Sequence, residues 1–273
     1  MTDGVVVRRP GRDGTWDPLR ALITDRELLV TLVERQVRLR RKRSFMGVAW
    51  PLLAPLFLFA LYRYVFGSIF QAPVEDYGVY LFAGLLPWTF LLQTVNDALQ
   101  SISFELDLVR RAPFPHHLLP LSRVVVMVVP FLTLLVLFVA YLALWSDRGI
   151  DAAVLPLLLV PLTSLVLLVA SASTVLALVD VFNRDLRYLL HNLFTLWFFL
   201  VPIVYHHRMM SDRMRTVTAV DPMRWIIEQF RDVLYHGRFE PLPALGTLGA
   251  CAMLFVGGLA LFGRLSVDLA KEV

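Results

Sequence analysis

Six apolar runs, each of about the length that crosses a bilayer, constrain the fold of this chain more than any other feature. They cover about 45–66, 77–98, 118–145, 154–181, 188–205 and 242–262. A helix needs about 20 apolar residues to cross the hydrocarbon core. The whole chain is 58% hydrophobic, whereas a soluble domain averages about 45–50%. The sequence therefore predicts an all-α membrane protein with six transmembrane helices.

The positions of arginine and lysine predict how these helices are oriented. If the N-terminus is cytoplasmic, the inner segments hold 18 of the 26 basic residues and the outer segments hold 7, with Arg63 inside the first span. Cytoplasmic loops usually carry such an excess of positive charge, so we expect both termini in the cytoplasm. The predicted parts are a disordered cytoplasmic arm (1–23), an amphipathic helix (24–44), a six-span domain (45–265) and a cytoplasmic tail (266–273).

The segment before the first span predicts a helix that lies flat on the cytoplasmic membrane surface. Leu29, Val33 and Val37 follow one another at helical spacing, and Glu34 and Arg38 are placed to form an ion pair. A basic cluster ends the helix and suits anionic lipid headgroups. Its members are Arg38, Arg40, Arg41, Lys42 and Arg43. The alternative is that these charges only fix the topology.

The connector after the second span, 101–123, is too polar to lie in hydrocarbon. It begins with serines and acids, continues with the basic pair Arg110 and Arg111, and contains prolines that interrupt a continuous helix. Apolar residues lie among its charges. The pattern favours a short amphipathic helix and a turn that a partner contacts, and the alternative is a solvated loop.

The outer segment 206–241 contains the pattern of one more short helix. Asp221 is suited to the N-cap, Pro222 to the first helical position and Gly237 to the stop. Apolar residues between them recur on one face. This helix could gate an exit on the far side of the membrane, or it could rest on the bilayer surface.

Motifs for catalysis are missing from the sequence. There is no P-loop, no H-E-x-x-H and no G-x-S-x-G, so we expect neither ATP hydrolysis nor any catalytic or metal site in this chain. The third, fifth and sixth spans carry almost no ionisable residue at their centres, which disfavours ion-coupled transport. Asp97 and Asp180 lie near predicted cytoplasmic ends, and Arg63 either reaches outward or faces a pore. Whatever the chain moves would need an outside source of energy.

Aromatic residues are dense in three of the spans. Most such rings anchor a helix at the membrane interface, but they could also form a lining on which sugar rings stack. The candidates for such a lining are Tyr62, Tyr64, Phe66, Trp88, Phe90, Trp197, Phe198, Phe199 and Tyr205.

Several stretches together resemble the membrane subunits of second-type ABC exporters, and most closely the branch that exports O-antigen, teichoic acid and other cell-envelope polysaccharides. These stretches are RRKRSFMGVAWPLLAPLFLFALYRYVFG, YLFAGLLPWTFL, LVRRAPFPHHLLPLSRV, RDLRYLLHNLFTLWFFLVPIVY and DPMRWIIEQFRDVLY. The resemblance implies a homodimeric permease of the inner membrane, with two copies of a separate ATPase that binds ATP and Mg²⁺. It implies no cofactor in this chain and no nucleic-acid partner.

The resemblance also implies roles for particular residues. The first connector would hold a coupling helix that docks on the ATPase, with a second contact after the fourth span; these residues are Phe104, Glu105, Asp107, Arg110, Arg111, Phe114, Pro115, Arg184 and Asp185. The basic cluster would meet the diphosphate of a polyprenyl-linked glycan. The outer helix, with Trp225, Ile226 and Phe230, would be the gate. Alternatives are a drug or lipid exporter of the same family and, from another class, a polyprenyl-linked glycosyltransferase.

Overall fold

The computed structural model describes residues 22, 24–43, 50–65, 76–105, 115–145, 153–183, 185–205 and 210–272, of which 41–43 and 266–272 are described by their backbone only. These residues form helices and turns, with no strand among them. The helices are α2 (Arg26–Arg43), α3 (Trp50–Tyr62), α4 (Tyr77–Leu99), α6 (Leu118–Trp145), α7 (Leu159–Phe182), α8 (Leu186–Leu200), α9 (Asp212–Thr218), α10 (Pro222–Leu234) and α11 (Pro241–Glu272), with 3₁₀ turns η2 (Ser103–Glu105) and η3 (Leu155–Leu158). The all-helical prediction is confirmed for this part of the chain. Most of the predicted arm lies outside it.

Each of the six apolar runs contains a helix, but four of the described helices are long and apolar enough to cross a membrane. These four spans cover Tyr77–Glu105, Leu118–Leu144, Leu155–Phe182 and Pro241–Leu265. A shorter apolar helix covers Trp50–Val65, and the first residues of that predicted span lie outside the described ranges. The count of six spans and the orientation stay predictions.

The fifth predicted span is shorter in the structure than in the sequence analysis. We expected it to continue to Tyr205, but α8 ends at Leu200 and Val201 is already extended, with φ −78° and ψ 133°. The cause is Pro202, because proline disfavours helical backbone at the preceding residue and cannot donate a helical hydrogen bond. Residues 201–205 therefore form an irregular segment whose backbone carbonyls need other donors.

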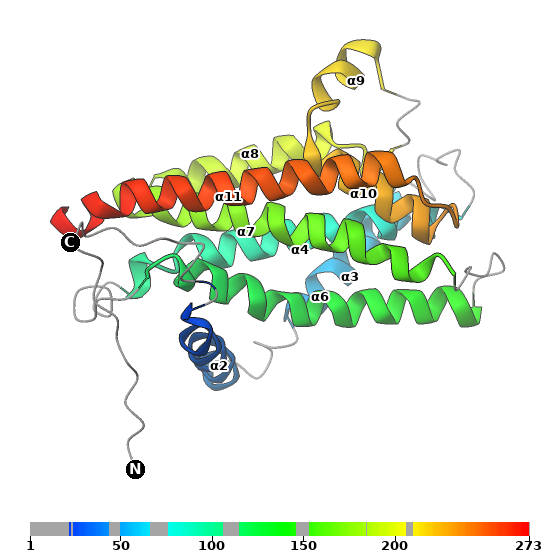
Figure 1. The fold of residues 1–273 in the computed structure, drawn as a ribbon. Coiled ribbons are helices and arrows are strands. Elements are labelled where there is room, and N and C mark those ends of the chain that lie inside the picture. Colours follow the sequence, from blue (N-terminus) through cyan, green and yellow to red (C-terminus); the bar gives the residue numbers. More distant parts are fainter. Residues whose placement is uncertain are drawn as a thin grey trace.

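Helix α4 is the centre of the bundle. It packs against α3, α6, α7, α8 and α10, and Leu81, Leu85 and Val95 on it are fully buried. The longest helix, α11, packs along α7 (Figure 1). There Ser171 donates a hydrogen bond to the Leu254 carbonyl at 2.7 Å, and Gly258 gives Ser171 the room to approach. Small residues commonly permit such close contact between membrane helices.

Two amphipathic helices lie at opposite ends of this bundle. Helix α2 runs across the long helices and is seen nearly end-on in Figure 1; it packs on α6 through a face that buries Leu32 and Gln36. Helix α10 packs against α4, α7 and α11 near the opposite end. On the predicted orientation, α2 lies at the cytoplasmic side and α10 at the outer side. We therefore call these the cytoplasmic end and the outer end of the bundle.

Candidate functional site

An ion pair joins α2 to the first connector at the cytoplasmic end. The Arg35 guanidinium donates to the Glu105 carboxylate at 2.8 Å. Glu105 lies in η2, next to Phe104, whose side chain is 69% exposed. A movement of the connector would therefore act directly on α2, and Phe104 presents an apolar side chain for a partner to contact.

Asp180, at the end of α7, joins the first connector to the second. Its carboxylate is fully buried and accepts two hydrogen bonds from Arg187 on α8, at 2.5 and 2.7 Å. The Ser103 hydroxyl donates a third at 2.7 Å. Bidentate arginine–carboxylate pairs fix geometry as well as charge. The cluster formed by Ser103, Asp180 and Arg187 thus ties η2, α7 and α8 together at one point.

A second group of charges attaches the basic end of α2 to the bundle. Arg40 donates to Asp97 of α4 at 2.5 Å, and Arg123 of α6 lies 3.8 Å from the same carboxylate. Arg38 points away and pairs with Glu34 at 3.2 Å, as predicted, with both side chains mainly exposed. Within the predicted basic cluster, Arg38 is therefore a more accessible cation than Arg40. The side chains of Arg41, Lys42 and Arg43 lie outside the description.

Of the other residues predicted to couple the chain to the ATPase, the structure describes two, Pro115 and Asp185. Pro115 is buried just before α6, and Asp185 is exposed before α8, where its amide donates to the Asn183 side chain at 3.0 Å. Asp107, Arg110, Arg111, Phe114 and Arg184 lie outside the described residues. The structure therefore brings Glu105 together with Arg35 in the middle of α2, while the docking role of the connector stays a prediction.

The aromatic residues proposed as a lining differ widely in exposure. Trp88, Phe90 and Phe198 are buried within the chain, and Tyr62, Trp197 and Tyr205 are half-buried. Trp88 packs edge-on against Trp197 at 5.4 Å, and Tyr62 stacks on Phe198 at 5.3 Å. Rings that pack on one another have less free surface for a sugar to stack on, and the lining stays a prediction. Tyr64 and Phe199 are exposed, and Phe66 lies outside the described residues.

The predicted caps of the outer helix are present. Asp221 accepts a hydrogen bond from the Met223 amide at 2.9 Å, and Gly237 follows α10 with a φ of +62°. Asp221 also accepts from the Trp197 indole at 2.7 Å, so the cap links α10 to α8. Burial raises the pKa of the Asp221 carboxyl, while the hydrogen bonds from Trp197 and Met223 oppose that shift.

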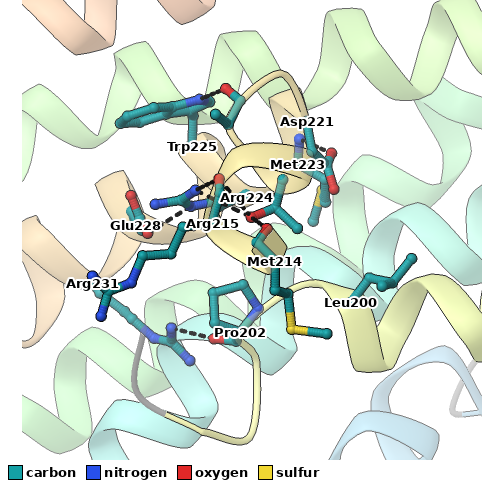
Figure 2. Close-up of polar contacts among 12 residues, drawn as sticks. Leu200, Pro202, Met214, Arg215, Asp221, Met223, Arg224, Trp225, Glu228 and Arg231 are labelled. Carbon is teal, nitrogen blue, oxygen red and sulfur yellow. Dashed lines mark hydrogen bonds and ion pairs between the residues drawn. The ribbon is translucent and has the colours of Figure 1, made fainter. Parts of the chain in front are cut away.

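Helix α10 is docked into the bundle rather than resting beside it. Ile226 and Phe230 are fully buried, whereas Trp225 lies half-exposed and donates from its indole to the Ala219 carbonyl at 2.7 Å (Figure 2). Of the two readings of this helix, the surface helix is therefore incompatible with the packing. A gate built from α10 would have to move together with the elements that it packs on.

Arg231 is the functional candidate that the sequence analysis missed. It lies on α10 with only 4% of its surface exposed, and its guanidinium donates to the Pro202 carbonyl at 2.6 Å (Figure 2). The guanidinium also donates to the Ile203 carbonyl at 2.5 Å. It also donates to the Tyr80 carbonyl at 3.3 Å and lies 3.7 Å from the centre of the Tyr80 ring. Buried carbonyls without donors are costly, so Arg231 supplies what the broken end of α8 lacks.

Two tyrosines of α4 complete this arrangement. The Tyr77 hydroxyl donates to the Val204 carbonyl at 2.9 Å, and the Tyr80 hydroxyl donates to the Tyr205 carbonyl at 3.1 Å. Together with Arg231 they satisfy four successive carbonyls of the segment 202–205. We call Tyr77, Tyr80 and Arg231 the outer clamp. A signal for it was visible in the sequence, because Arg231 follows Ile227 by four residues and so shares the buried face of the helix.

Within the described ranges, no three His, Cys, Asp or Glu side chains are grouped as metal ligands. The charged groups that the structure brings together are each matched by an opposite charge or by carbonyls. The contacts at both sites hold helices together.

Comparisons with known proteins agree with this architecture. Residues 27–235 match the family described as ABC-2 type transporter. The O-antigen export system permease protein RfbA of Myxococcus xanthus is 31% identical over 240 residues, which cover 84% of this chain and 90% of that protein. The protein of the same description from Klebsiella pneumoniae is 24% identical over 249 residues, covering 90% of this chain and 94% of that protein. The chain therefore belongs to the ABC-2 type transporter family and is related, within it, to O-antigen export permeases.

Proposed function

We propose that this chain is the channel-forming permease subunit of an ATP-driven exporter that moves polyprenyl-diphosphate-linked polysaccharide across the cytoplasmic membrane. Two copies of the chain would form the channel, and two copies of a separate ATPase, with ATP and Mg²⁺, would drive it. The similarity to O-antigen export permeases over most of the chain supports the class of cargo.

The observation that carries the mechanism is the position of Glu105 and Ser103 in the cytoplasmic network. Glu105 contacts α2 through Arg35, and Ser103 contacts α7 and α8 through Asp180. A force applied at the exposed Phe104 would therefore reach three helices through direct contacts. Rigid-body movement of packed helices is a common way for such a force to open a path.

In this mechanism, closure of the ATPase dimer pushes on the first connector near Phe104. The connector moves α2 together with the cytoplasmic ends of α7 and α8. The lipid diphosphate would enter near the exposed Arg38, since guanidinium groups donate to phosphate oxygens in pairs. At the outer end, the clamp keeps α8 joined to α10, so α8 would carry the gate helix with it.

Depletion of the chain in the organism that encodes it tests the cargo. We expect lipid-linked glycan to accumulate on the cytoplasmic side, and we expect re-expression of the wild-type chain to clear it. An unchanged level of lipid-linked glycan, together with greater sensitivity to a drug or an altered lipid composition, would favour a drug or lipid exporter instead.

Reconstitution of the purified chain tests the source of energy. We expect export into vesicles only when the partner ATPase and ATP are present, and we expect replacement of both Arg110 and Arg111 by Glu to abolish association with the ATPase. Survival of both association and export in that double variant would show that the coupling role is misassigned. Glycosyl transfer by the chain alone would point to the enzyme class.

A further inference from the structure

Arg63 is a charged residue that the proposed function does not use. It directly follows α3, in a wider helical turn over 63–65, and its side chain is exposed. It makes no hydrogen bond and no ion pair with the residues that the structure describes. Arginines within or at the end of apolar membrane helices normally reach a partner or the headgroup region. Among the described residues Arg63 thus has no anionic partner, and its exposed guanidinium is accessible to an anionic group.

An apolar groove opens beside Arg63, between α3, α4 and α6. Its volume is about 390 Å³, which lies within the usual range of about 300–1,000 Å³ for small-molecule sites. Three packed rings form its floor. Phe59 lies edge-on to Phe82 at 5.0 Å, and Phe82 lies edge-on to Phe138 at 4.7 Å. The groove is therefore shaped by rigid rings and offers an apolar surface to a hydrocarbon chain.

The end of the groove at Arg63 is polar. A wider hollow of about 590 Å³ adjoins it, and Arg63, Tyr64, Asp76 and Tyr141 are among the residues that line it. Gly78 faces the guanidinium, and a Cβ at that position would collide with it. Glycine therefore leaves the space in which Arg63 lies between the apolar groove and the polar hollow.

The groove opens at the surface of the chain. Leu56, Leu137 and Tyr141 on its rim are all exposed. Helix α3 ends, α4 begins and α6 ends near this level, so the polar hollow lies at the outer end of three helices. On the predicted orientation, that level is the headgroup region of the outer leaflet.

We propose that this groove is a binding site for an anionic phospholipid of the outer leaflet. An acyl chain would lie on Phe59, Phe82 and Phe138, and the phosphodiester would accept hydrogen bonds from Arg63. One guanidinium matches the single charge of a phosphodiester. A diphosphate would bring a second negative charge toward Asp76, so the cargo lipid fits this site less well. The site is independent of the transported glycan.

Native mass spectrometry of the purified full-length chain tests this site. The chain would be titrated with phosphatidylglycerol and with phosphatidylcholine that carries the same acyl chains. We expect wild-type protein to bind phosphatidylglycerol about tenfold more tightly, and Arg63→Gln to remove that preference. Arg63→Lys should keep part of it. Arg213→Gln is the matched control, because Arg213 is an exposed arginine on α9, and it should bind both lipids as the wild type does.

A second variant keeps the test valid if Arg63→Gln folds poorly. Leu137→Trp fills the groove without changing the charge, and it should weaken the binding of both phospholipids. Equal binding of the two phospholipids by the wild type would overturn the proposal, as would displacement of phosphatidylglycerol by an equimolar polyprenyl diphosphate. Cross-linking between two copies through Leu137→Cys would also overturn it, by showing a subunit interface; the native Cys251 is buried and would not interfere.

Discussion

At the cytoplasmic end, carboxylates on α4, η2 and α7 pair with arginines on α2, α6 and α8; at the outer end, an arginine donates to backbone carbonyls. The cytoplasmic pairs include partly exposed groups, such as Arg35 and Arg187. Arg231 of the outer clamp is almost fully buried. Ion pairs that water reaches can separate and re-form at a modest cost in free energy. Moving a buried donor away from its carbonyls costs much more, because the carbonyls are then left without hydrogen bonds. The comparison indicates a cytoplasmic end that can rearrange and an outer end that moves as one body.

The largest effect is expected at the outer clamp. Arg231→Met removes the donors to Pro202, Ile203 and Tyr80, and we expect it to lower the free energy of unfolding by about 3–5 kcal/mol. Thermal unfolding of the purified protein in detergent measures this loss. Arg213→Met removes an exposed arginine of α9 and should leave the Tm unchanged. Equal Tm values for the two variants would remove the distinction between the two ends.

A smaller effect on stability, but a specific effect on coupling, is expected at Asp180. Asp180→Asn keeps the size of the side chain but loses the charge that binds Arg187 in two places. Arg187 is partly exposed and can turn to water, so we expect a loss of about 2 kcal/mol. ATP hydrolysis by the assembled transporter should continue while export falls severalfold.

The control for that variant is Asp212→Asn, at a fully exposed carboxylate of α9. It removes the same charge without touching the cluster, and both activities should stay near the wild-type level. Normal export by Asp180→Asn would mean that the two connectors do not need to be joined.

Asp221 gives a weaker, pH-dependent test of the outer end. Its pKa is raised by burial, so the folded chain holds a proton more tightly than the unfolded chain. The stability contributed by protonation then rises as the pH falls through the raised pKa toward the ordinary value. The Tm of the wild type should therefore rise relative to the Tm of Asp221→Asn as the pH is lowered from 7 to 4. Asn is an equally good cap, so a constant difference would mean that Asp221 does not titrate in this window.

Local signals predicted much of this fold, and long-range contacts explain the rest. The cap at Asp221, the stop at Gly237 and the pair formed by Glu34 and Arg38 depend on residues within a turn of one another. The end of α8 was misplaced because the apolar pattern continues past Pro202, although that proline was visible. Composition shows where a span can lie but not where its backbone turns.

The two sites depended on contacts between distant segments. Asp180 and Arg187 lie near the end of α7 and the start of α8, and Ser103 reaches Asp180 from 77 residues away in the sequence. The composition of the polar connector predicted contact with a partner, and the family resemblance implied a coupling role that stays a prediction. The binding of the connector to α2 through Glu105 was not predicted. Arg231 was overlooked because an arginine on a short outer helix normally faces water. The role of Arg231 depends on its hydrogen bonds to the carbonyls of Pro202 and Ile203, and no local sequence pattern connects those residues to Arg231.

The smallest effect on stability is expected at Arg38, and it separates support of the fold from binding of cargo. Arg38 and Glu34 form an exposed pair, which contributes at most about 0.5 kcal/mol. Arg38→Gln and Glu34→Gln both break the pair, so both should keep the wild-type Tm, but only the first removes the cation proposed to meet the lipid diphosphate. If Arg38→Gln lowers export of lipid-linked glycan while Glu34→Gln does not, the deficit follows from the lost cation and not from the lost pair. Equal export by the two variants would leave the basic end of α2 with a role in topology alone.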